Sequence, residues 1–381
     1  MPLSVSVASA SLREAISDAA RGLVERESLV EMIALSAVAG EHMLVIGPPG
    51  TAKSEAVRRV AHATGGRYFE YLLGRFTEPS EIFGTVDLRR LKEGVVETET
   101  SGMLPEAEIA FLDEVFLGST AILNTLLGIL NERTFRRGHT RVSCPLRVCV
   151  GASNALPEDD SLAAFADRFL VRAFLDPIAD PMLERLLEGG WTLLEHRVER
   201  RTSIEQLDAL TEAAQNADMS RVRPVIAHAV RILRGIGITL TDRRAVKVQR
   251  LVAAAAVLAG RSRPDESDLW PIVFAVPTRD QQSAARDGLR EMLDRTENHT
   301  LSAASEEASL GRMARAVRIA EAGRQILGAR PEGDDAEAIS GWRLKLEGVA
   351  REIDAGFTVE QMPEELAQVR ALIVERLQQQ H

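Results

Sequence analysis

Apolar and polar residues alternate with two different periodicities along the chain. Between residues 12 and 38 apolar side chains recur at near-helical spacing, which predicts one or two helices. From residue 42 to residue 175, short apolar runs bounded by Gly and Pro alternate with stretches of helical spacing. Such alternation predicts a parallel sheet that helices cover on both faces. The predicted strands are 42–46, 67–71, 109–112, 146–150 and 171–175, with helices near 54–63, 119–132 and 161–166.

The strand pattern largely ends after Asp176 and Pro177, and helical spacing continues beyond them. A chain of 381 residues exceeds the roughly 250–300 residues at which a single core stops growing, so several domains are expected. We predict an α/β domain at 1–178, an all-α lid at 179–278 and a helical C-terminal bundle at 279–381. The predicted helices of the last two parts are 182–188, 204–217, 221–235, 242–259, 281–327, 335–353 and 359–379.

Charge and cysteine content narrow the function classes. The formal net charge is −10 and no long Lys/Arg block occurs, which disfavours nucleic acid as the partner without excluding it. Cys144 and Cys149 lack companions at metal-ligand spacing, so we expect small buried residues or a reduced pair rather than a metal site or a redox bridge. No apolar run approaches about 20 residues and no secretory leader pattern is present, so we expect no membrane span and a cytoplasmic protein.

The strongest chemical signal follows the first predicted strand. Its pattern is that of a phosphate-binding loop, with Ala in place of Gly before the Lys, and a helix follows it. Backbone N–H groups there would bind phosphate, Lys53 would reach the β- and γ-oxygens, and Ser54 would ligate Mg²⁺. The extra methyl of Ala52 predicts a negative φ at that residue. The alternative is a Gly/Pro turn that precedes Lys-Ser by chance. The predicted loop consists of Gly47, Pro48, Pro49, Gly50, Thr51, Ala52, Lys53 and Ser54.

Three further polar groups fit catalysis of phosphoryl transfer. Asp113 and Glu114 end an apolar strand, where Asp113 would hold Mg²⁺ and Glu114 would act as general base; a plain helix cap is the alternative. Asn154 ends a later strand and would bind the attacking water or the γ-phosphate, unless it only turns the chain before a proline.

Two arginines are candidates for binding the γ-phosphate. Arg168 precedes the last strand and is similar to an arginine finger, with Arg172 in reserve; the alternative is an ion pair of Arg168 with Asp167 or Asp176. Arg243 follows a Thr-Asp helix cap in the second domain. A cation in a first helical turn opposes the helix dipole, which favours a phosphate-binding role. Arg244 would serve equally, and the alternative is that both are plain solvated side chains.

These motifs together resemble the MoxR family of AAA+ ATPases, and more narrowly its RavA branch. The match is dense over about 40–180 and thinner beyond, where Asp242-Arg243-Arg244 is the shorter match. Ala before the Lys is shared with this branch. The segments that carry the resemblance include Gly-Pro-Pro-Gly-Thr-Ala-Lys-Ser at 47–54, Glu-Ile-Phe-Gly at 81–84, Phe-Leu-Asp-Glu at 111–114, Asn-Glu-Arg-Thr-Phe-Arg at 131–136, Ala-Ser-Asn-Ala-Leu-Pro-Glu at 152–158 and Asp-Arg-Phe-Leu-Val-Arg at 167–172.

The resemblance implies an αβα sheet domain with a helical lid, assembled as a hexameric ring with ATP and Mg²⁺ at the subunit boundaries. It implies a pore-facing insertion, for which residues 85–105 are in place, with a hairpin near 93–96. It also implies a partner with a von Willebrand factor A domain and the remodelling or maturation of a client protein complex. Some RavA-type members insert a β-rich domain among the C-terminal helices, where this chain has only the break at 328–333.

Two other function classes compete with an ATP-driven remodeller. One is a nucleotide-controlled assembly scaffold with little turnover, which would need neither Glu114 nor Arg168. The other is a DNA-directed AAA+ motor, which the acidic balance disfavours. ATP turnover with and without DNA separates the three.

Overall fold

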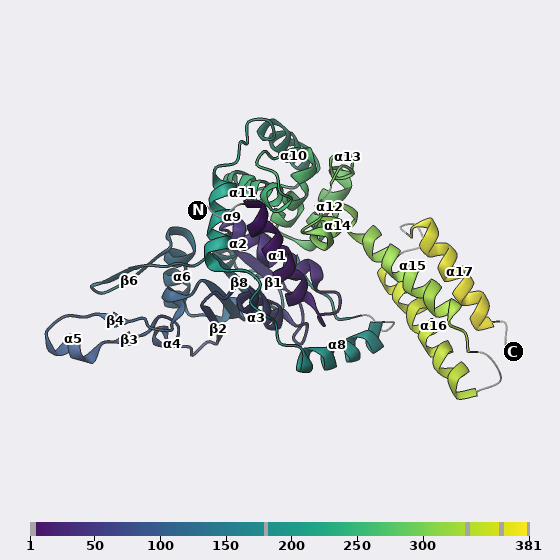
Figure 1. The fold of residues 1–381 in the computed structure, drawn as a ribbon, viewed down its shortest axis with the longest axis horizontal. Coiled ribbons are helices and arrows are strands. Elements are labelled where there is room, and N and C mark those ends of the chain that lie inside the picture. The colour runs from purple at the N-terminus through teal and green to yellow at the C-terminus, as the bar shows by residue number, and fades with distance from the viewer. Residues whose placement is uncertain (1–4, 179–181, 297, 332–335, 358–361, 379–381) are drawn as a thin grey trace.

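The central feature of the fold is one parallel sheet. The computed structural model describes residues 5–178, 182–296, 298–331, 336–357 and 362–378. Five strands pair in the order β2-β5-β8-β1-β9, all parallel, which confirms the predicted α/β fold (Figure 1). They are β1 (Met43–Ile46), β2 (Tyr68–Leu72), β5 (Ile109–Asp113), β8 (Val148–Ser153) and β9 (Val171–Phe174).

The sheet separates two hydrophobic clusters, because successive side chains of a strand point to opposite faces. In β1, Met43 and Val45 pack into one cluster, and Leu44 and Ile46 pack into the other. The four are buried, as expected for a central strand that helices cover on both sides. The first cluster includes residues of α1 (Val5–Ala20), α2 (Glu27–Ala39) and α3 (Lys53–Thr64), and the second includes residues of α4 (Pro79–Phe83), α6 (Thr120–Glu132) and α7 (Asp160–Ala166).

Parallel strands give the sheet two different edges. We call them the carboxyl edge, where the strands end, and the amino edge, where they begin. The predicted phosphate-binding loop follows β1 at the carboxyl edge. Glu41 and His42 precede β1, and residues 167–170 precede β9, at the amino edge.

The chain crosses from the carboxyl edge to the amino edge before it forms the lid. Helix α8 (Leu183–Glu195) follows β9, and residues 196–203 then reach the end of α3. There the backbone N–H groups of Arg201 and Thr202 both donate to the Ala63 carbonyl, at 3.1 and 3.2 Å. Because α3 starts at the phosphate-binding loop and runs back along the sheet, its end lies at the amino edge. The lid helices are α9 (Ile204–Gln215), α10 (Arg223–Gly235) and α11 (Asp242–Leu258).

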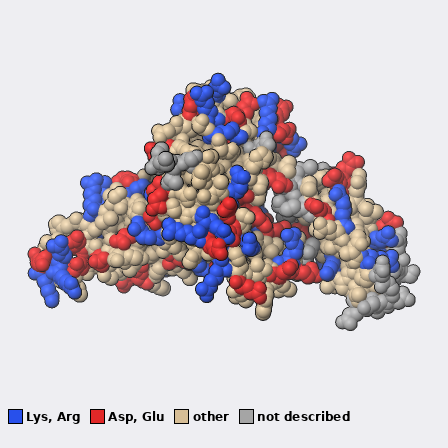
Figure 2. All heavy atoms as spheres, in the orientation of Figure 1, with Lys and Arg blue, Asp and Glu red and all other residues tan. Residues whose placement is uncertain are grey.

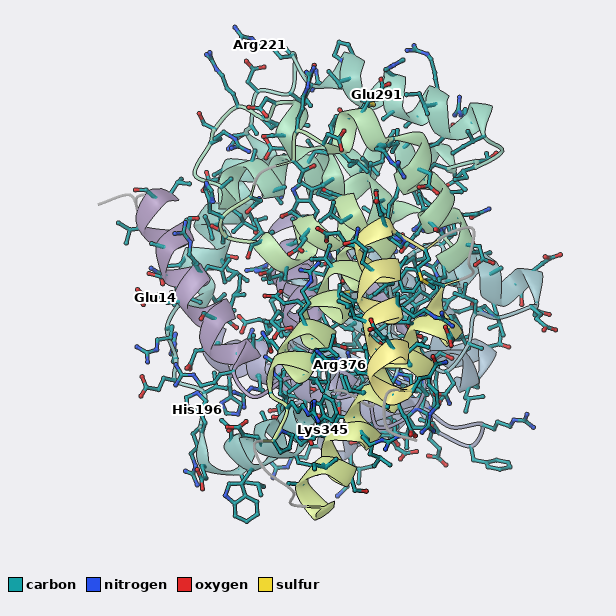
Figure 3. The ribbon with its side chains drawn as sticks, turned by 90° about the vertical axis from the view of Figure 1, so that its right-hand side faces the viewer. Glu14, His196, Arg221, Glu291, Lys345 and Arg376 are labelled. Carbon is teal, nitrogen blue, oxygen red and sulfur yellow. The ribbon has the colours of Figure 1, made fainter. Side chains whose placement is uncertain are left out.

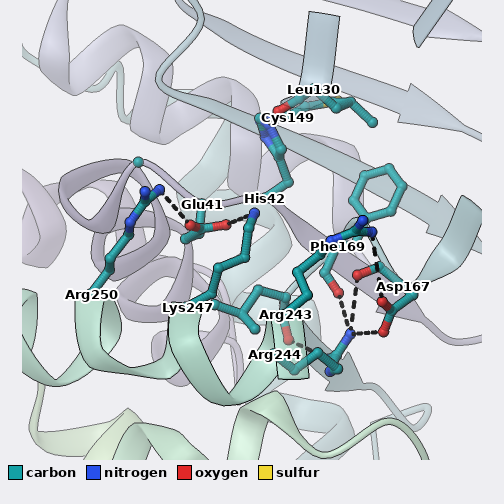
Figure 4. A network of polar contacts seen from close by, with 12 residues as sticks. Glu41, His42, Leu130, Cys149, Asp167, Phe169, Arg243, Arg244, Lys247 and Arg250 are labelled. Carbon is teal, nitrogen blue, oxygen red and sulfur yellow. Dashed lines mark hydrogen bonds and ion pairs between the residues drawn. The ribbon is translucent and has the colours of Figure 1, made fainter. Parts of the chain in front are cut away.

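Helix α11 is fixed to the amino edge by buried charges (Figure 4). The carboxylate of Glu41 is fully buried and accepts from Lys247 at 2.5 Å and from Arg250 at 2.9 Å. A buried carboxylate is costly unless such partners compensate it, so this pair of contacts determines where α11 lies relative to β1.

Arg244 makes the second attachment of α11. Its guanidinium is almost fully buried and donates to the carbonyls of Ala275, Phe169 and Leu170, at 2.8, 3.1 and 2.5 Å. It also pairs with Asp167 at 3.2 Å. One side chain thereby satisfies three carbonyls of the segments that flank β9 and the lid.

His42 joins three elements beside this attachment. Its Nδ1 accepts from the backbone N–H of Cys149 at 3.0 Å, and its Nε2 lies 2.9 Å from the Leu130 carbonyl. The Arg133 guanidinium also contacts Nε2, so a cation lies beside the ring. Complete burial lowers the pKa of His42 well below its usual value, so the ring stays neutral.

Two hairpins project together from the sheet domain. The insertion contains a hairpin of β3 (Thr85–Val86) and β4 (Thr98–Glu99), with the short helix α5 (Leu88–Lys92) between them. The predicted place near 93–96 is wrong, because these residues follow α5 and the paired strands lie on either side of them. A second hairpin, β6 (Thr134–Arg137) and β7 (Thr140–Ser143), was not predicted from the sequence. The Thr98 backbone N–H donates to the Thr140 hydroxyl at 2.7 Å, which holds the two hairpins side by side (Figure 1).

The C-terminal helices belong to two different cores. Apolar residues of α12 (Arg279–Gly288), α13 (Arg290–Leu293) and α14 (Ser302–Leu310) pack into the first cluster with the lid. Helices α15 (Arg312–Gly328), α16 (Ala336–Gly356) and α17 (Glu364–Gln378) form a bundle with its own core. The predicted three domains stay a proposal, and this packing places 279–310 with the lid. Within the described parts of the chain, no helix is both long and apolar enough for a bilayer crossing.

Replacing Arg244 tests the attachment of the lid. We expect Arg244→Ala to lower the melting temperature by several degrees, because it removes about 3 kcal/mol of buried hydrogen bonds and ion pairing. The neighbouring Arg243 is about 43% exposed, so Arg243→Ala should change stability by less than about 0.5 kcal/mol. Thermal unfolding followed by circular dichroism measures both. Equal effects of the two substitutions would contradict this account of α11.

Candidate functional site

The loop at 47–54 is built from backbone that only a few residue types tolerate. A Cβ on Gly47 would lie 2.9 Å from the Leu175 carbonyl, so a larger residue does not fit there. Gly50 has a φ of +79°, a conformation that favours glycine. The Gly47 backbone N–H donates to the Ser153 carbonyl at 3.1 Å, which ties the loop to the end of β8.

Ala52 departs from the prediction. The expected negative φ is wrong, because Ala52 has a φ of +61° and lies in the left-handed region. The turn that directs the chain into α3 requires this conformation at the residue before Lys53. Ala52 therefore adopts a backbone conformation that costs roughly 1 kcal/mol of folding free energy relative to glycine.

Lys53 is folded back onto the loop that carries it. It is the first residue of α3, and its ammonium donates to the carbonyls of Gly47 and Pro48, at 2.7 and 3.0 Å. Burial lowers the pKa of Lys53, while the carboxylates of Asp113 and Glu114 act in the opposite direction. A buried ammonium directed at the concave side of such a loop suits an anion with several oxygens.

Two predicted acids and an amide meet beside this loop. Asp113 is the last residue of β5, and its carboxylate accepts from the Glu114 backbone N–H at 3.0 Å. The Asn154 amide donates to the Glu114 carboxylate at 2.7 Å. Glu114 has a φ of +49°, and such strain in a non-glycine residue is typical of functional sites. The structure therefore brings Glu114 and Asn154, two residues predicted separately from the ends of two strands, into contact.

The residues present fit a magnesium ion. Ser54 lies in the first turn of α3, and Asp113 lies at the end of β5 two strands away, both at the carboxyl edge. Hydroxyl and carboxylate oxygens are the ligands that Mg²⁺ prefers, with water and phosphate oxygens completing its shell.

Arg26 supports the loop and was missed by sequence reasoning. Its buried guanidinium donates to the Thr51 carbonyl at 3.0 Å and to the Asp176 carbonyl at 2.7 Å. It thus joins the start of α2 to the phosphate-binding loop and to the chain after β9. It lies within the stretch 12–38 that the sequence predicts as one or two helices, and that pattern carries no functional signal.

Arg168 lies away from the loop, just before β9. Both carboxylates proposed for a local ion pair have other partners, because Asp167 pairs with Arg244 and Asp176 pairs with Arg279. The Nε of Arg168 has no hydrogen-bond partner among the described residues. Arg172, the reserve candidate, is buried and donates to the Ala166 carbonyl, so its guanidinium is not accessible.

Arg243 and Arg244 have different environments. Arg244 is the buried attachment described above, whereas Arg243 is exposed and lies 4.0 Å from Asp167. The Thr241 hydroxyl accepts from the Arg244 backbone N–H at 3.3 Å, which confirms the predicted cap of α11. The structure thus places Arg243 near Asp167, the residue before Arg168, at the amino edge.

The site residues are divided between the two edges of the sheet. The loop, Asp113, Glu114 and Asn154 lie at the carboxyl edge, while Arg168 and Arg243 lie at the amino edge. A strand of four residues such as β9 spans about 13 Å, so the two groups of one chain are not in contact. The cysteines are outside both groups: Cys144 and Cys149 are buried and unpaired, as predicted.

A phosphate-binding loop after β1, an acid pair after β5 and the order β2-β5-β8-β1-β9 define an AAA+ ATPase fold. The chain belongs to the MoxR family within that class, because a family model described as the "MoxR domain in the MoxR-vWA-beta-propeller ternary systems" matches residues 10–212. No match confirms the narrower RavA branch, which stays a prediction.

Two relatives extend the comparison. The uncharacterized protein MJ0812 of Methanocaldococcus jannaschii is 37% identical over 250 residues, which are 65% of this chain and 66% of that protein. The chaperone MoxR1 of Mycobacterium tuberculosis is 27% identical over 165 residues, 42% of this chain and 43% of its own length. The chain spans just under two thirds of the first curated relatives, at 66% and 64%.

A solved structure shares the fold. The crystal structure of a candidate ATPase from Cytophaga hutchinsonii aligns with a TM-score of 0.62 and 16% identity, over 77% of this chain and 97% of that one. Identity this low bears on the fold alone.

Lys53 provides the direct test of the loop. We expect Lys53→Ala to abolish nucleotide binding, because it removes the ammonium that the loop directs toward the phosphates. Titration with a fluorescent ATP analogue measures the affinity. Lys92→Ala, in the exposed helix α5, is the matched control and should bind like the unaltered protein. Near-normal affinity of the Lys53 variant would refute the site.

Proposed function

We propose that the protein is a ring-forming ATPase that couples ATP hydrolysis to the remodelling or maturation of a protein complex. The observation that carries this proposal is the division of the site residues between opposite edges of the sheet. A single copy has the phosphate-binding loop and the acids on one side and the arginines on the other, so that a ring of copies would complete each site.

The residues at the carboxyl edge have distinct proposed roles. The loop and Lys53 bind the phosphates of ATP, and Ser54 and Asp113 supply the protein ligands of Mg²⁺, which neutralises phosphate charge when bound. Glu114 orients and deprotonates the attacking water. Asn154 holds the Glu114 carboxylate at 2.7 Å and would exchange this contact for the water or the γ-phosphate.

The arginines at the amino edge are proposed to act on a neighbouring copy. Arg168 would stabilise negative charge on the γ-phosphoryl group, a contribution of about 10³–10⁵ in rate in related systems. Arg243, the lid arginine predicted to bind the γ-phosphate, lies at the same edge and pairs only weakly with Asp167 at 4.0 Å. Both side chains would therefore reach the nucleotide of the next subunit.

The partner class is proposed from the matched family. Its description names a system of MoxR, vWA and beta-propeller components, which supports a von Willebrand factor A domain protein as the partner. The paired hairpins at 85–99 and 134–143 project from the sheet domain and are the segments that we propose to face the pore and the client. A scaffold without turnover would not need the contact between Glu114 and Asn154.

Glu114→Gln separates binding from hydrolysis. We expect the variant to keep ATP affinity and to lose turnover by at least about 100-fold, because the amide cannot accept a proton from water. The amide oxygen still accepts from Asn154, so the local structure should persist. Steady-state phosphate release and nucleotide titration measure the two properties. Turnover within a few-fold of the unaltered protein would leave Glu114 as a turn residue.

Mixing two inactive variants tests catalysis across a subunit boundary. Arg168→Ala and Lys53→Ala should each be nearly inactive, and the Arg168 variant should lose kcat far more than ATP affinity. A mixture should regain activity, because an intact Arg168 then faces an intact loop on the next copy. The readout is turnover across a mixing series at fixed total protein. No recovery at any ratio, with subunit exchange verified by fluorescence, would refute action in trans.

A further inference from the structure

Helix α8 carries an exposed apolar stripe. Leu187, Trp191 and Leu194 are 75%, 67% and 78% exposed, and Leu183 continues the row at 44%. Their spacing of three and four residues places them on one face of the helix. Exposed apolar rows of this size mark interaction sites more often than free surface.

The opposite face of α8 attaches the helix to the body close to the nucleotide site. Gly189 is buried against Gly22, where a Cβ on Gly189 would lie 2.7 Å from the Gly22 carbonyl. The segment after Gly22 leads to Arg26, which holds Thr51 of the phosphate-binding loop. The stripe therefore flanks the carboxyl edge.

An acidic row borders the stripe. Glu184, Glu188 and Glu195 follow one another at helical spacing beside the apolar face. Glu184 pairs with Lys345 of α16 at 2.7 Å. Glu188 and Glu195 are exposed and form no ion pair within the described chain.

The lid carries the complementary surface on the other side of the molecule. Residues 219–250 contain eight basic residues and one acidic residue, Asp242, in a chain of net charge −10. Val246 is 63% exposed one turn after Arg243, and Arg231 of α10 is exposed without an ion pair in the described chain. Arg244 of these eight is buried, and Lys247 and Arg250 pair with Glu41, so they do not contribute to the docking surface. The other five are exposed, and they are Arg221, Arg223, Arg231, Arg234 and Arg243.

The two surfaces face opposite ways. Arg221, just before α10, and His196, which follows α8, lie at opposite ends of the molecule in Figure 3, and Figure 1 agrees. In Figure 2 basic side chains gather at the top, over α10, and acidic ones lie on the lower rim near α8. The apolar stripe and the basic lid surface of one copy therefore cannot contact each other. A head-to-tail arrangement brings the stripe of one copy against the lid of the next.

We propose that α8 of one copy docks on the α10–α11 face of the next copy, with the apolar stripe against Val246 and the acidic row against the lid arginines. This inference rests on the proposed ring and deepens it, because it names the surfaces that bring Arg168 and Arg243 to a neighbour's nucleotide. The exposed Val246 among the arginines favours a protein surface over a nucleic acid, whose phosphates make no use of an apolar contact.

Cross-linking between differently labelled copies tests the contact. Copies with Leu194→Cys are mixed with copies with Val246→Cys and treated with a short bismaleimide in the presence of the slowly hydrolysed analogue ATPγS. The native Cys144 and Cys149 are buried, so they should not react. We expect a covalent dimer from the mixture and none from either variant alone. A dimer from Leu194→Cys alone would indicate a two-fold contact between α8 helices and would overturn the proposal.

Assembly measured by sedimentation velocity gives the second readout. Trp191→Ser combined with Leu194→Ser should raise the concentration for half-assembly about tenfold or more, while monomers still bind the fluorescent ATP analogue. Leu344→Ser, at a site that is 68% exposed on α16, is the matched control and should assemble normally. Glu188→Arg with Glu195→Arg should also weaken assembly, and adding Arg231→Glu to the same chain should restore part of it.

The outcomes separate this inference from the proposed function. If the α8 variants assemble like the unaltered protein, docking through α8 is overturned while the ring stands. If the unaltered protein never assembles with nucleotide, the ring and the docking contact both fail. If assembly is unchanged but the Arg231 variant loses binding to duplex DNA, or the α8 variant loses a von Willebrand factor A partner, the surface serves that partner instead of a second copy.

Discussion

All five strands of the sheet run in the same direction, and this polarity gives the molecule two chemically different edges. The loops at the carboxyl edge contain the phosphate-binding loop and the acids, since β1, β5 and β8 end there. The segments at the amino edge contain Glu41 and Asp167, to which the lid is bound. The position of the nucleotide site and the position of α11 therefore both depend on the direction of the strands.

The contacts that fix the lid at the amino edge bury charged side chains, and burying a charge costs free energy unless partners compensate it. Glu41 and Arg244 are nearly inaccessible, and each is compensated by several partners rather than by one. Removing a partner would leave an uncompensated group, so the arrangement is stable only as a whole. The same attachment fixes Arg243, one residue before Arg244, on the outside of the molecule. The buried Arg244 thereby determines the position of Arg243, for which we propose a role in nucleotide binding.

The local pattern of apolar and polar residues predicted most of the sheet domain. It did not predict features that depend on contacts between distant segments. The strands and the position of Glu114 and Asn154 at strand ends followed from apolar runs that end in polar residues, whereas their direct contact depends on the strand order, which the sequence did not predict. The positive φ of Ala52 could not be predicted, since the turn into α3 imposes it against the preference of the residue. Arg26 and the β6–β7 hairpin left no distinctive pattern either. The choice between Arg243 and Arg244 required knowing which side chain is buried.

The route of the chain through α8 explains how these parts are connected. After β9 and α8, residues 196–203 carry the chain past the end of α3, which brings α9, α10 and α11 to the amino edge. At the carboxyl edge, Arg279 of α12 pairs with Asp176 at 2.8 Å. The crossing helix contacts the body through Gly189 and Leu193 and pairs with α16 through Glu184, while its apolar face stays exposed. The position of α9 to α11 at the amino edge and the exposed face of α8 are thus two consequences of one connection, and a neighbouring copy docked on α8 would cover that face.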